Sequence, residues 1–140
     1  FIYCYSIPSL LVLGEFKIIR RQQMKIKNDL VTQNYTEIEH EDEFKFNAPH
    51  HFEVKNVNNG EVVTRIDMQE GPIEENGING CFTEDLIAIA LVRLESFQNS
   101  EYRCRENAVA ITKLEEALMW LRKRTNRRVE VGTEGTSIGN

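Results

Sequence analysis

The residues whose types and spacing best suit chemistry are two arginines near the predicted start of a helix. Arg103 and Arg105 flank Cys104, and Asn107 and Thr112 follow them. The N–H groups and the dipole of a helix N-terminus favour an anion, and a guanidinium can bind a phosphate through two hydrogen bonds. Thr112 follows Arg105 by seven residues, about two helical turns, and therefore falls on roughly the same helix face. The pattern predicts that the arginines bind a phosphate. The amide of Asn107 and the hydroxyl of Thr112 would then contact a base or ribose edge of the same ligand.

Each candidate also has a purely structural interpretation. Arg105 can pair with Glu101 or Glu106 on the helix surface. Phe82, at the entry to an earlier helix, can pack onto its first turn or stack on a nucleobase. Asn79 lies in a glycine-rich turn, where it can hold the turn or line a ligand site. The spacing alone leaves these alternatives open.

Signs of catalysis or metal binding are weak. His50 and His51 are adjacent, and adjacent side chains on an extended chain point to opposite sides. The three cysteines show no metal-ligand spacing, and no known catalytic motif occurs. We therefore expect no metal, no cofactor and no enzymatic activity, and we interpret the acidic run at 39–43 as solvated surface.

Composition favours one compact domain. The chain has 140 residues, 41% of them hydrophobic, and a net charge of −5. The charge is uneven, because residues 34–75 are rich in acids and residues 93–128 are rich in arginine. A local arginine cluster can hold a small anion while the rest of the surface repels nucleic acid. The odd cysteine count argues against a disulfide framework and favours a reducing cytoplasm.

The elements that must position these residues form a predicted helical hairpin. Thr83 is expected to cap the first helix, which Asn99 and Ser100 end. The second helix is expected from about Cys104 to Thr125, followed by a frayed tail. Apolar residues at steps of three and four predict two facing stripes. The stripes consist of Leu86, Ala90, Leu94 and Phe97 on the first helix and Ala108, Ile111, Leu114, Leu118 and Leu121 on the second.

Strand patterns precede the hairpin. The alternation at 44–46, 52–54 and 62–68 predicts an antiparallel sheet, with a tight turn at 58–60. Residues 40–43 are expected to form an exposed loop, and Gly71-Pro72 to end the sheet. The predicted class is α+β, with a small antiparallel sheet at residues 24–72, a helical hairpin at 73–128 and a disordered tail at 129–140.

Residues 1–23 are expected to be an extension outside the protein proper. Arg20-Arg21-Gln22-Gln23-Met24 can be encoded AGG-AGA-CAA-CAA-ATG, a purine-rich ribosome-binding site before a start codon. Met24 would then be the first residue. The alternative is an amphipathic extra strand or a membrane-touching arm, although the apolar run is too short to span a bilayer.

Two segments carry a family resemblance. GPIEENGINGCFTEDLIAIALVRLESFQ at 71–98 and CRENAVAITKLEEALMWLRKRT at 104–125 resemble the phage nucleotide sponges that counter Thoeris defence, and their relatives that counter CBASS defence. The resemblance implies a dimer or hexamer that captures cyclic nucleotide signals and releases them unaltered. The implied signal is a glycocyclic ADP-ribose, with cyclic di- or trinucleotides in separate pockets of some members.

Position within this resemblance implies the ligand contacts. The CREN segment supplies the strongest candidates, the turn GING and the residue after it supply the next, and three further arginines are included for their charge. The implied contacts are Arg105, Asn107, Thr112, Asn79, Phe82, Arg103, Arg93 and Arg124. The resemblance does not assign them to one pocket or another.

Three classes of function compete. A ligand-sequestering sponge leads, since an enzyme would need a metal cluster or an acid–base pair. A small nucleic-acid-binding phage regulator that uses the basic run at 122–128 is the alternative. Trp120 adds an apolar group on a second side of its helix, which predicts burial against another copy of the chain. We expect no membrane partner and no nucleic acid polymer as the ligand.

Overall fold

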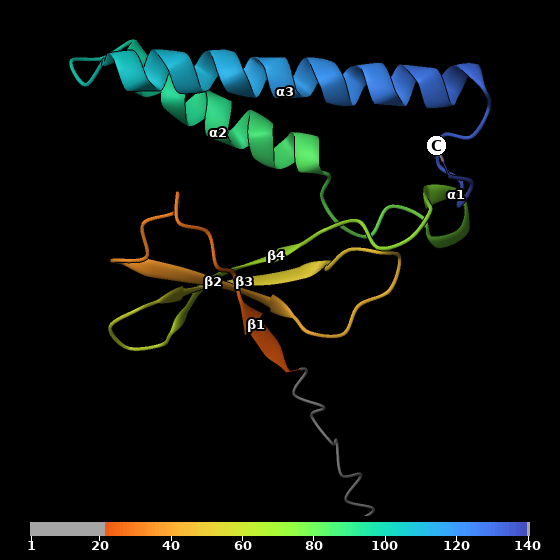
Figure 1. Ribbon diagram of the computed structural model, residues 1–140, viewed down its shortest axis with the longest axis horizontal. Helices are drawn as coiled ribbons and strands as arrows, with labels where there is room; N and C mark the ends of the chain where they lie inside the picture. The colour runs from red at the N-terminus through yellow and green to blue at the C-terminus, as the bar shows by residue number, and fades with distance from the viewer. Residues whose placement is uncertain (1–21, 140) are drawn as a thin grey trace, which may run out of the picture.

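The computed structural model describes residues 22–139, which form an antiparallel sheet followed by a helical hairpin (Figure 1). The four strands lie in the order of the sequence. They are β1 (Gln23–Lys25), β2 (Thr36–Glu41), β3 (His51–Asn56) and β4 (Val62–Asp67). The helices are α1 (Ile73–Asn76), α2 (Thr83–Gln98) and α3 (Arg105–Glu130). The predicted α+β class is confirmed. The expectation that residues 1–23 are an extension outside the protein proper lies outside the described residues except at Gln22 and Gln23.

The sheet has one apolar and one charged face. Val54 pairs with Ile38, and Phe52 pairs with Ile66, so that these side chains share a face. On the opposite face Lys55 forms ion pairs with Glu39 and Glu53. The turn predicted between β3 and β4 is present, with Gly60 at a φ of 71°. Alternation along the strands therefore sets which face meets the helices.

Two local predictions in this part are wrong. Residues 44–46 form a turn instead of a strand, because Phe46 and Asn47 adopt positive φ values of 56° and 67°. The expected exposed loop at 40–43 begins inside β2, and Glu41 is almost fully buried. Its carboxylate accepts a hydrogen bond from the backbone N–H of His50 at 2.9 Å. This long-range contact gives a buried acid a partner.

The hairpin pairs α2 with α3 as expected, and the structure corrects how α2 begins. Phe82 is the N-cap residue, and Thr83 is the first residue of the helix. The Asp85 carboxylate accepts the backbone N–H of Phe82 at 2.8 Å. An acid in the first turn thus accepts the N–H of the N-cap residue. The sequence had instead predicted a capping hydroxyl from Thr83. Asn99 ends α2, and Cys104 caps α3.

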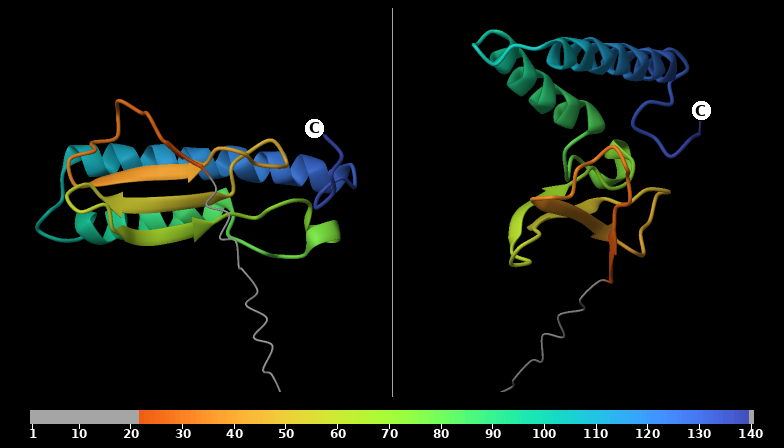
Figure 2. Two further views of the ribbon diagram at one scale, coloured as in Figure 1. Left: turned by 90° about the horizontal axis from the view of Figure 1, so that it is seen from below. Right: turned by 60° about the vertical axis from the view of Figure 1, so that its left-hand side comes forward.

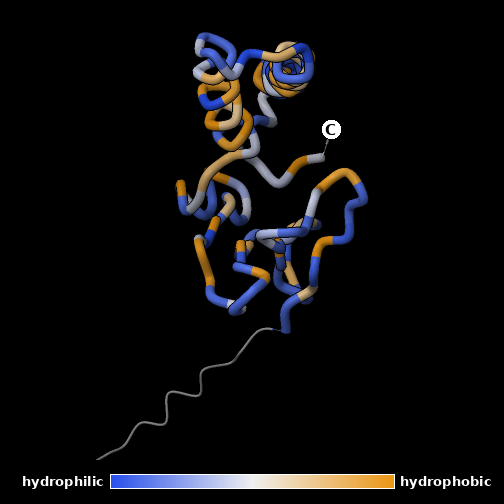
Figure 3. The backbone as a smooth tube through the Cα atoms, turned by 90° about the vertical axis from the view of Figure 1, so that its left-hand side faces the viewer, coloured by the Kyte–Doolittle hydropathy of each residue, from blue (hydrophilic) through white to orange (hydrophobic). Residues whose placement is uncertain are grey.

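The two helices run over the apolar face of the sheet, roughly along the strands (Figures 1 and 2). Hydrophobic positions recur along both helices and alternate with hydrophilic ones in the sheet (Figure 3). Among residues 22–139, Leu91 is the only buried hydrophobic residue. The space between sheet and hairpin is therefore not filled by a closely packed core.

The end of the chain differs from expectation. Helix α3 continues five residues beyond the predicted end at Thr125, to Glu130. Residues 133–138 then fold back and hydrogen-bond to Arg128. This segment lies beside α1 (Figure 1), where the N–H of Glu74 donates to the carbonyl of Gly135 at 3.1 Å. The segment expected to be a disordered tail is held by these contacts as far as it is described.

No helix within residues 22–139 is long and apolar enough to cross a membrane.

Candidate functional site

A cavity of about 980 Å³ lies between the apolar face of the sheet, the hairpin and the C-terminal segment. Its volume is within the range of about 300–1,000 Å³ typical of small-molecule sites. One wall is apolar and comes from alternate residues of β2, β3 and β4 and from the residue that follows β1. These residues are Ile26, Ile38, Phe52, Val54 and Ile66. They are only half-buried, so a ligand entering the cavity would contact apolar surface.

The opposite wall comes from the hairpin. Leu86 on α2 and Leu121 on α3 supply apolar surface, and Arg124 and Arg128 supply charge. The two arginines are four residues apart, which places them on one face of α3. The hairpin therefore contributes both kinds of contact that an amphipathic anionic ligand needs.

The two arginines differ in exposure and in hydrogen bonding. Arg128 is buried and hydrogen-bonded to the C-terminal segment. Arg124 is exposed and forms no hydrogen bond or ion pair with any residue between 22 and 139. Arg124 is thus the guanidinium in the cavity wall with donors available to a phosphate.

Phe82 enters the cavity wall because the chain before it is tied to the sheet. Cys81 donates its N–H to the carbonyl of Asp67 at 2.9 Å and accepts from the N–H of Gln69 at 2.8 Å. Gly80 permits this approach, since a Cβ there would overlap the backbone of Met68. Phe82 follows directly, half-buried in the cavity wall. Its ring can offer a face to a nucleobase from a firmly held position.

The histidine pair has structural partners. Nε2 of His50 lies 2.8 Å from the Lys45 carbonyl, which secures the turn that replaced the predicted strand. Nδ1 of His51 lies 2.7 Å from Oδ1 of Asp67 on the neighbouring strand. No group of three His, Cys, Asp or Glu side chains suited to a metal ion occurs in the described part of the chain.

Of the eight predicted contacts, only Phe82 and Arg124 line the cavity. Asn79 is committed to the turn instead. Its side chain donates to the carbonyl of Glu70 and accepts the N–H of the same residue, both at 2.8 Å. These bonds use the amide in holding the Gly77–Gly80 turn against the end of the sheet.

The remaining five candidates lie away from the cavity, in or near the half of the hairpin that carries its tip. Arg105 begins α3, and the 19 residues to Arg124 span roughly 28 Å of helix. Thr112 donates its hydroxyl to the Ala108 carbonyl at 3.1 Å. The other three are Arg93, whose guanidinium lies 5.6 Å from the Phe97 ring centre, Arg103 and Asn107. A single chain does not bring the two groups of predicted residues together.

Arg105 itself is free of the surface pairings considered for it. It forms no hydrogen bond or ion pair with Glu101, Glu106 or any other described side chain. Cys104 caps the helix by accepting the backbone N–H of Asn107 on its Sγ at 3.4 Å. The arginine is therefore exposed at the start of α3 with its donors available.

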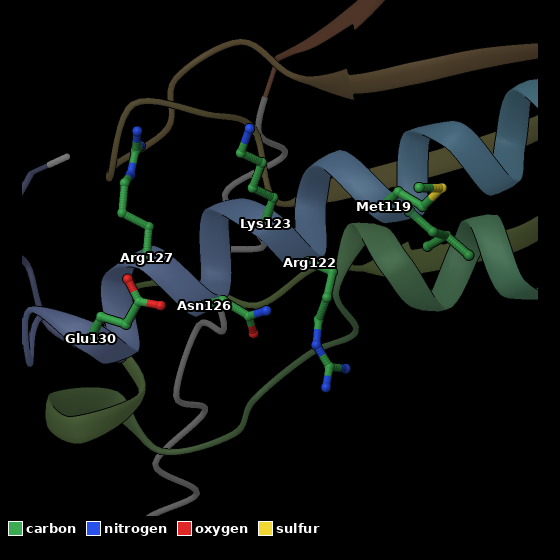
Figure 4. Close-up of a pocket in the computed structure, with 7 residues that line it drawn as sticks. Met119, Arg122, Lys123, Asn126, Arg127 and Glu130 are labelled. Atoms are coloured by element: carbon green, nitrogen blue, oxygen red, sulfur yellow. The ribbon is translucent and has the colours of Figure 1, made fainter.

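A second, shallower hollow runs along the outer side of α3 and is lined by residues of this helix only. Figure 4 shows Lys123 and Arg127 projecting on one side of the helix and Arg122 on the other. Its volume is about 750 Å³. Because one helix supplies all of its lining, a molecule bound there would be covered on one side unless another surface closed the groove.

The sequence missed several residues of the cavity. Phe46, His50, Arg128 and residues 134–139 all line it. The four-residue spacing of Arg124 and Arg128 was a usable signal for one of them. The C-terminal segment carried no such signal in its sequence, because most of its hydrogen bonds to Arg128 are accepted by backbone carbonyls, which every residue has.

Comparison with known proteins agrees with this architecture. The profile of the Acb2/Tad1 hairpin domain matches residues 60–126, which comprise β4, α1, α2 and most of α3. The chain is also similar to Thoeris anti-defense 1 of Bacillus phage SBSphiJ7. The two are 44% identical over 137 residues, which cover 80% of this chain and 96% of that protein. With this identity over nearly the whole length of the relative, the chain belongs to the Thoeris anti-defence family of phage proteins that contain the Acb2/Tad1 hairpin domain.

Proposed function

We propose that this protein counters Thoeris defence by binding a cyclic nucleotide signal, a glycocyclic ADP-ribose, and sequestering it without cleavage. The observation that carries the proposal is the cavity, which combines an aromatic ring, an apolar sheet wall and the Arg124 guanidinium, which has no partner among residues 22–139. Family membership supports the same reading. The site of action is the cytoplasm of the infected bacterium, where such signals are made.

The chemistry of the lining assigns a role to each wall. Phe82 stacks on the adenine, and the sheet residues contact the remaining apolar surface of the ligand. Arg124 pairs with a phosphate, whose charge needs a hydrogen-bonded cation when it leaves water. The roles proposed for these groups are binding and orientation, so we expect the ligand to be released unaltered.

Self-association completes the proposal. The outer faces of the hairpin carry Ile89, Val92, Met119 and Trp120, each more than half exposed. Such a surface, in a chain whose own core is small, favours burial against further copies. In a dimer or hexamer the exposed Arg105 can meet a ligand held by another copy. We therefore infer that the tip candidates Arg103, Arg105, Asn107 and Thr112 contact ligand only in the assembly, where cyclic di- or trinucleotides are possible second ligands.

The test combines affinity with recovery of the ligand. The purified full-length protein is titrated with glycocyclic ADP-ribose in a calorimeter, and the complex is then heated and analysed by mass spectrometry. Binding followed by release of a ligand of unchanged mass supports the sponge. A cleaved product would identify an enzyme, and no binding would refute the proposal.

The tip candidates have their own test. Arg105→Ala should weaken binding roughly 30- to 1,000-fold, the scale of about 2–4 kcal/mol for a phosphate left without its cation, while light scattering stays unchanged. Running glycocyclic ADP-ribose and a cyclic trinucleotide in parallel tells which ligand depends on Arg105. If parent and variant bind both ligands with equal affinity, Arg105 does not contact either ligand and the assignment of the tip residues is wrong.

A nucleic-acid-binding regulator is the second candidate, and the basic hollow on α3 is the observation in its favour (Figure 4). The net charge of −5 opposes it, because binding to duplex DNA relies on neutralising phosphates. A gel-shift titration at two salt concentrations separates the two functions. Duplex binding that weakens steeply with salt would favour the regulator, and no shift would leave the sponge as the function.

A further inference from the structure

The end of α3 carries a buried arginine that is hydrogen-bonded to the chain that follows it. Arg128 is only 7% exposed, although it lies in the last turn of a 26-residue helix between exposed neighbours. A buried guanidinium is stable only if its donors are hydrogen-bonded. The identity of its acceptors therefore shows what this residue holds in place.

Four acceptors of Arg128 lie in the C-terminal segment. Nε donates to Oε2 of Glu134 at 3.1 Å, and Nη1 donates to the carbonyl of Ile138 at 3.0 Å. Nη2 donates to the carbonyls of Thr133 and Thr136, at 2.6 and 3.2 Å. The chain thus curls around one guanidinium. The planar fork of arginine can serve acceptors in several directions at once, which the ammonium of lysine cannot do in the same geometry.

The far side of the same segment rests on α1. The N–H of Glu74 donates to the carbonyl of Gly135, and a Cβ added at Gly135 would lie 3.5 Å from Cγ of Glu74. Gly135 also has a φ of 76°, which L-residues adopt at a cost. Residues 134–139 therefore bridge the end of α3 and the loop after the sheet, and all six line the cavity.

We propose that residues 133–139 form a strap that closes one end of the ligand cavity, and that Arg128 is the positioning residue that holds this strap in place. The proposal rests on the proposed function for the ligand, but the strap itself is defined by contacts within the chain. Because the strap spans α3 and α1, it also keeps the hairpin at its spacing from the sheet. A bound ligand leaves more slowly when this wall is closed.

Two variants loosen the strap from opposite sides. Arg128→Ala removes the donors, and Gly135→Val places a branched side chain against α1 at a positive φ while leaving Arg128 unchanged. Arg127→Ala is the matched control, since Arg127 is adjacent, exposed and carries the same charge. Arg128→Lys keeps the charge without the fork.

The first readout is hydrogen exchange without ligand. The reporters are the amides of Thr133, which donates to the Arg128 carbonyl at 2.9 Å, and of Glu74, which donates to Gly135. We expect Arg128→Ala and Gly135→Val to raise exchange at both amides by about tenfold or more, the scale of one lost charge-assisted hydrogen bond. Arg128→Lys should fall between these and the parent, and Arg127→Ala should match the parent. If exchange at both amides is unchanged in Arg128→Ala, Arg128 does not hold the strap in place and the proposal is wrong.

The second readout is the dissociation rate of glycocyclic ADP-ribose. Both loosening variants should release it about tenfold faster, and the double variant should add little, because both changes act through one element. If Arg128→Ala releases ligand faster while Gly135→Val does not, Arg128 contacts the ligand directly and its positioning role is wrong. If the parent binds no cyclic nucleotide, the proposed function fails together with the ligand role of the strap, whereas the exchange result still decides whether Arg128 holds the segment.

Discussion

Arg124→Ala is the sharpest test of the cavity as the ligand site. The residue lies on the cavity wall, is exposed and has no partner among residues 22–139. Its removal therefore breaks no internal hydrogen bond, and the free energy of unfolding should change by no more than about 0.5 kcal/mol. Any larger effect on binding then reports on the ligand.

The expected loss follows from the contact proposed for it. A hydrogen bond to a charged group contributes about 1.5–3 kcal/mol. This corresponds to roughly 10- to 150-fold in Kd for glycocyclic ADP-ribose at 25 °C. Arg124→Lys should recover part of the loss, because an ammonium keeps the charge but cannot bind a phosphate bidentately.

Calorimetry of parent and variants measures this loss, with circular dichroism melting as the check on folding. Arg122→Ala is the control, since this arginine is exposed two residues earlier on α3 but lines the outer hollow instead of the cavity. Its affinity should equal that of the parent. If Arg124→Ala binds as tightly as the parent, or if Arg122→Ala loses as much, the phosphate does not meet Arg124 and the assignment of the cavity is wrong.

Three further predictions concern assembly and stability. Trp120→Ala should weaken self-association by about 3–5 kcal/mol if the indole, 61% exposed in one chain, is buried between copies; light scattering over a dilution series would contradict this by showing an unchanged mass. The hydrogen bond that Lys55 donates to the Glu39 carboxylate raises the pKa of Lys55 above its ordinary value of 10.5, so the stability that Lys55 contributes is complete below pH 10.5 and is lost as the pH rises through the raised value. Urea denaturation should show this alkaline loss in the parent and a flatter profile in Lys55→Met. Gly80→Ala should destabilise the fold by about 1–3 kcal/mol through overlap with the strand end, whereas Gly139→Ala, in open space, should melt like the parent.

The hairpin and the sheet could be predicted because their signals are local. Apolar residues at helical spacing, acids in the first turn of α2 and a stop at Asn99 act over a few residues, and the structure has both helices there. The turn around Gly60 likewise needs only the positive φ that its sequence permits. Phe82 and Arg124 were named from sequence, by resemblance and charge, and both line the cavity.

Tertiary structure decided the features whose partners are far away in sequence or are backbone groups. The sequence predicts Glu41 as part of an acidic surface run, yet it is buried, and its carboxylate accepts the N–H of His50, the residue before the next strand. The spacing of Arg105 and Arg124 along one straight helix separates candidates that composition had grouped together.

The C-terminal segment shows the same limit most clearly. Its sequence lacks helical or strand periodicity, which predicts disorder when only local patterns are considered. It is nevertheless held, because carbonyls of Thr133, Thr136 and Ile138 converge on Arg128. Carbonyls are common to every residue, so their convergence leaves no mark in the sequence and arises only once α3 has placed the guanidinium among them.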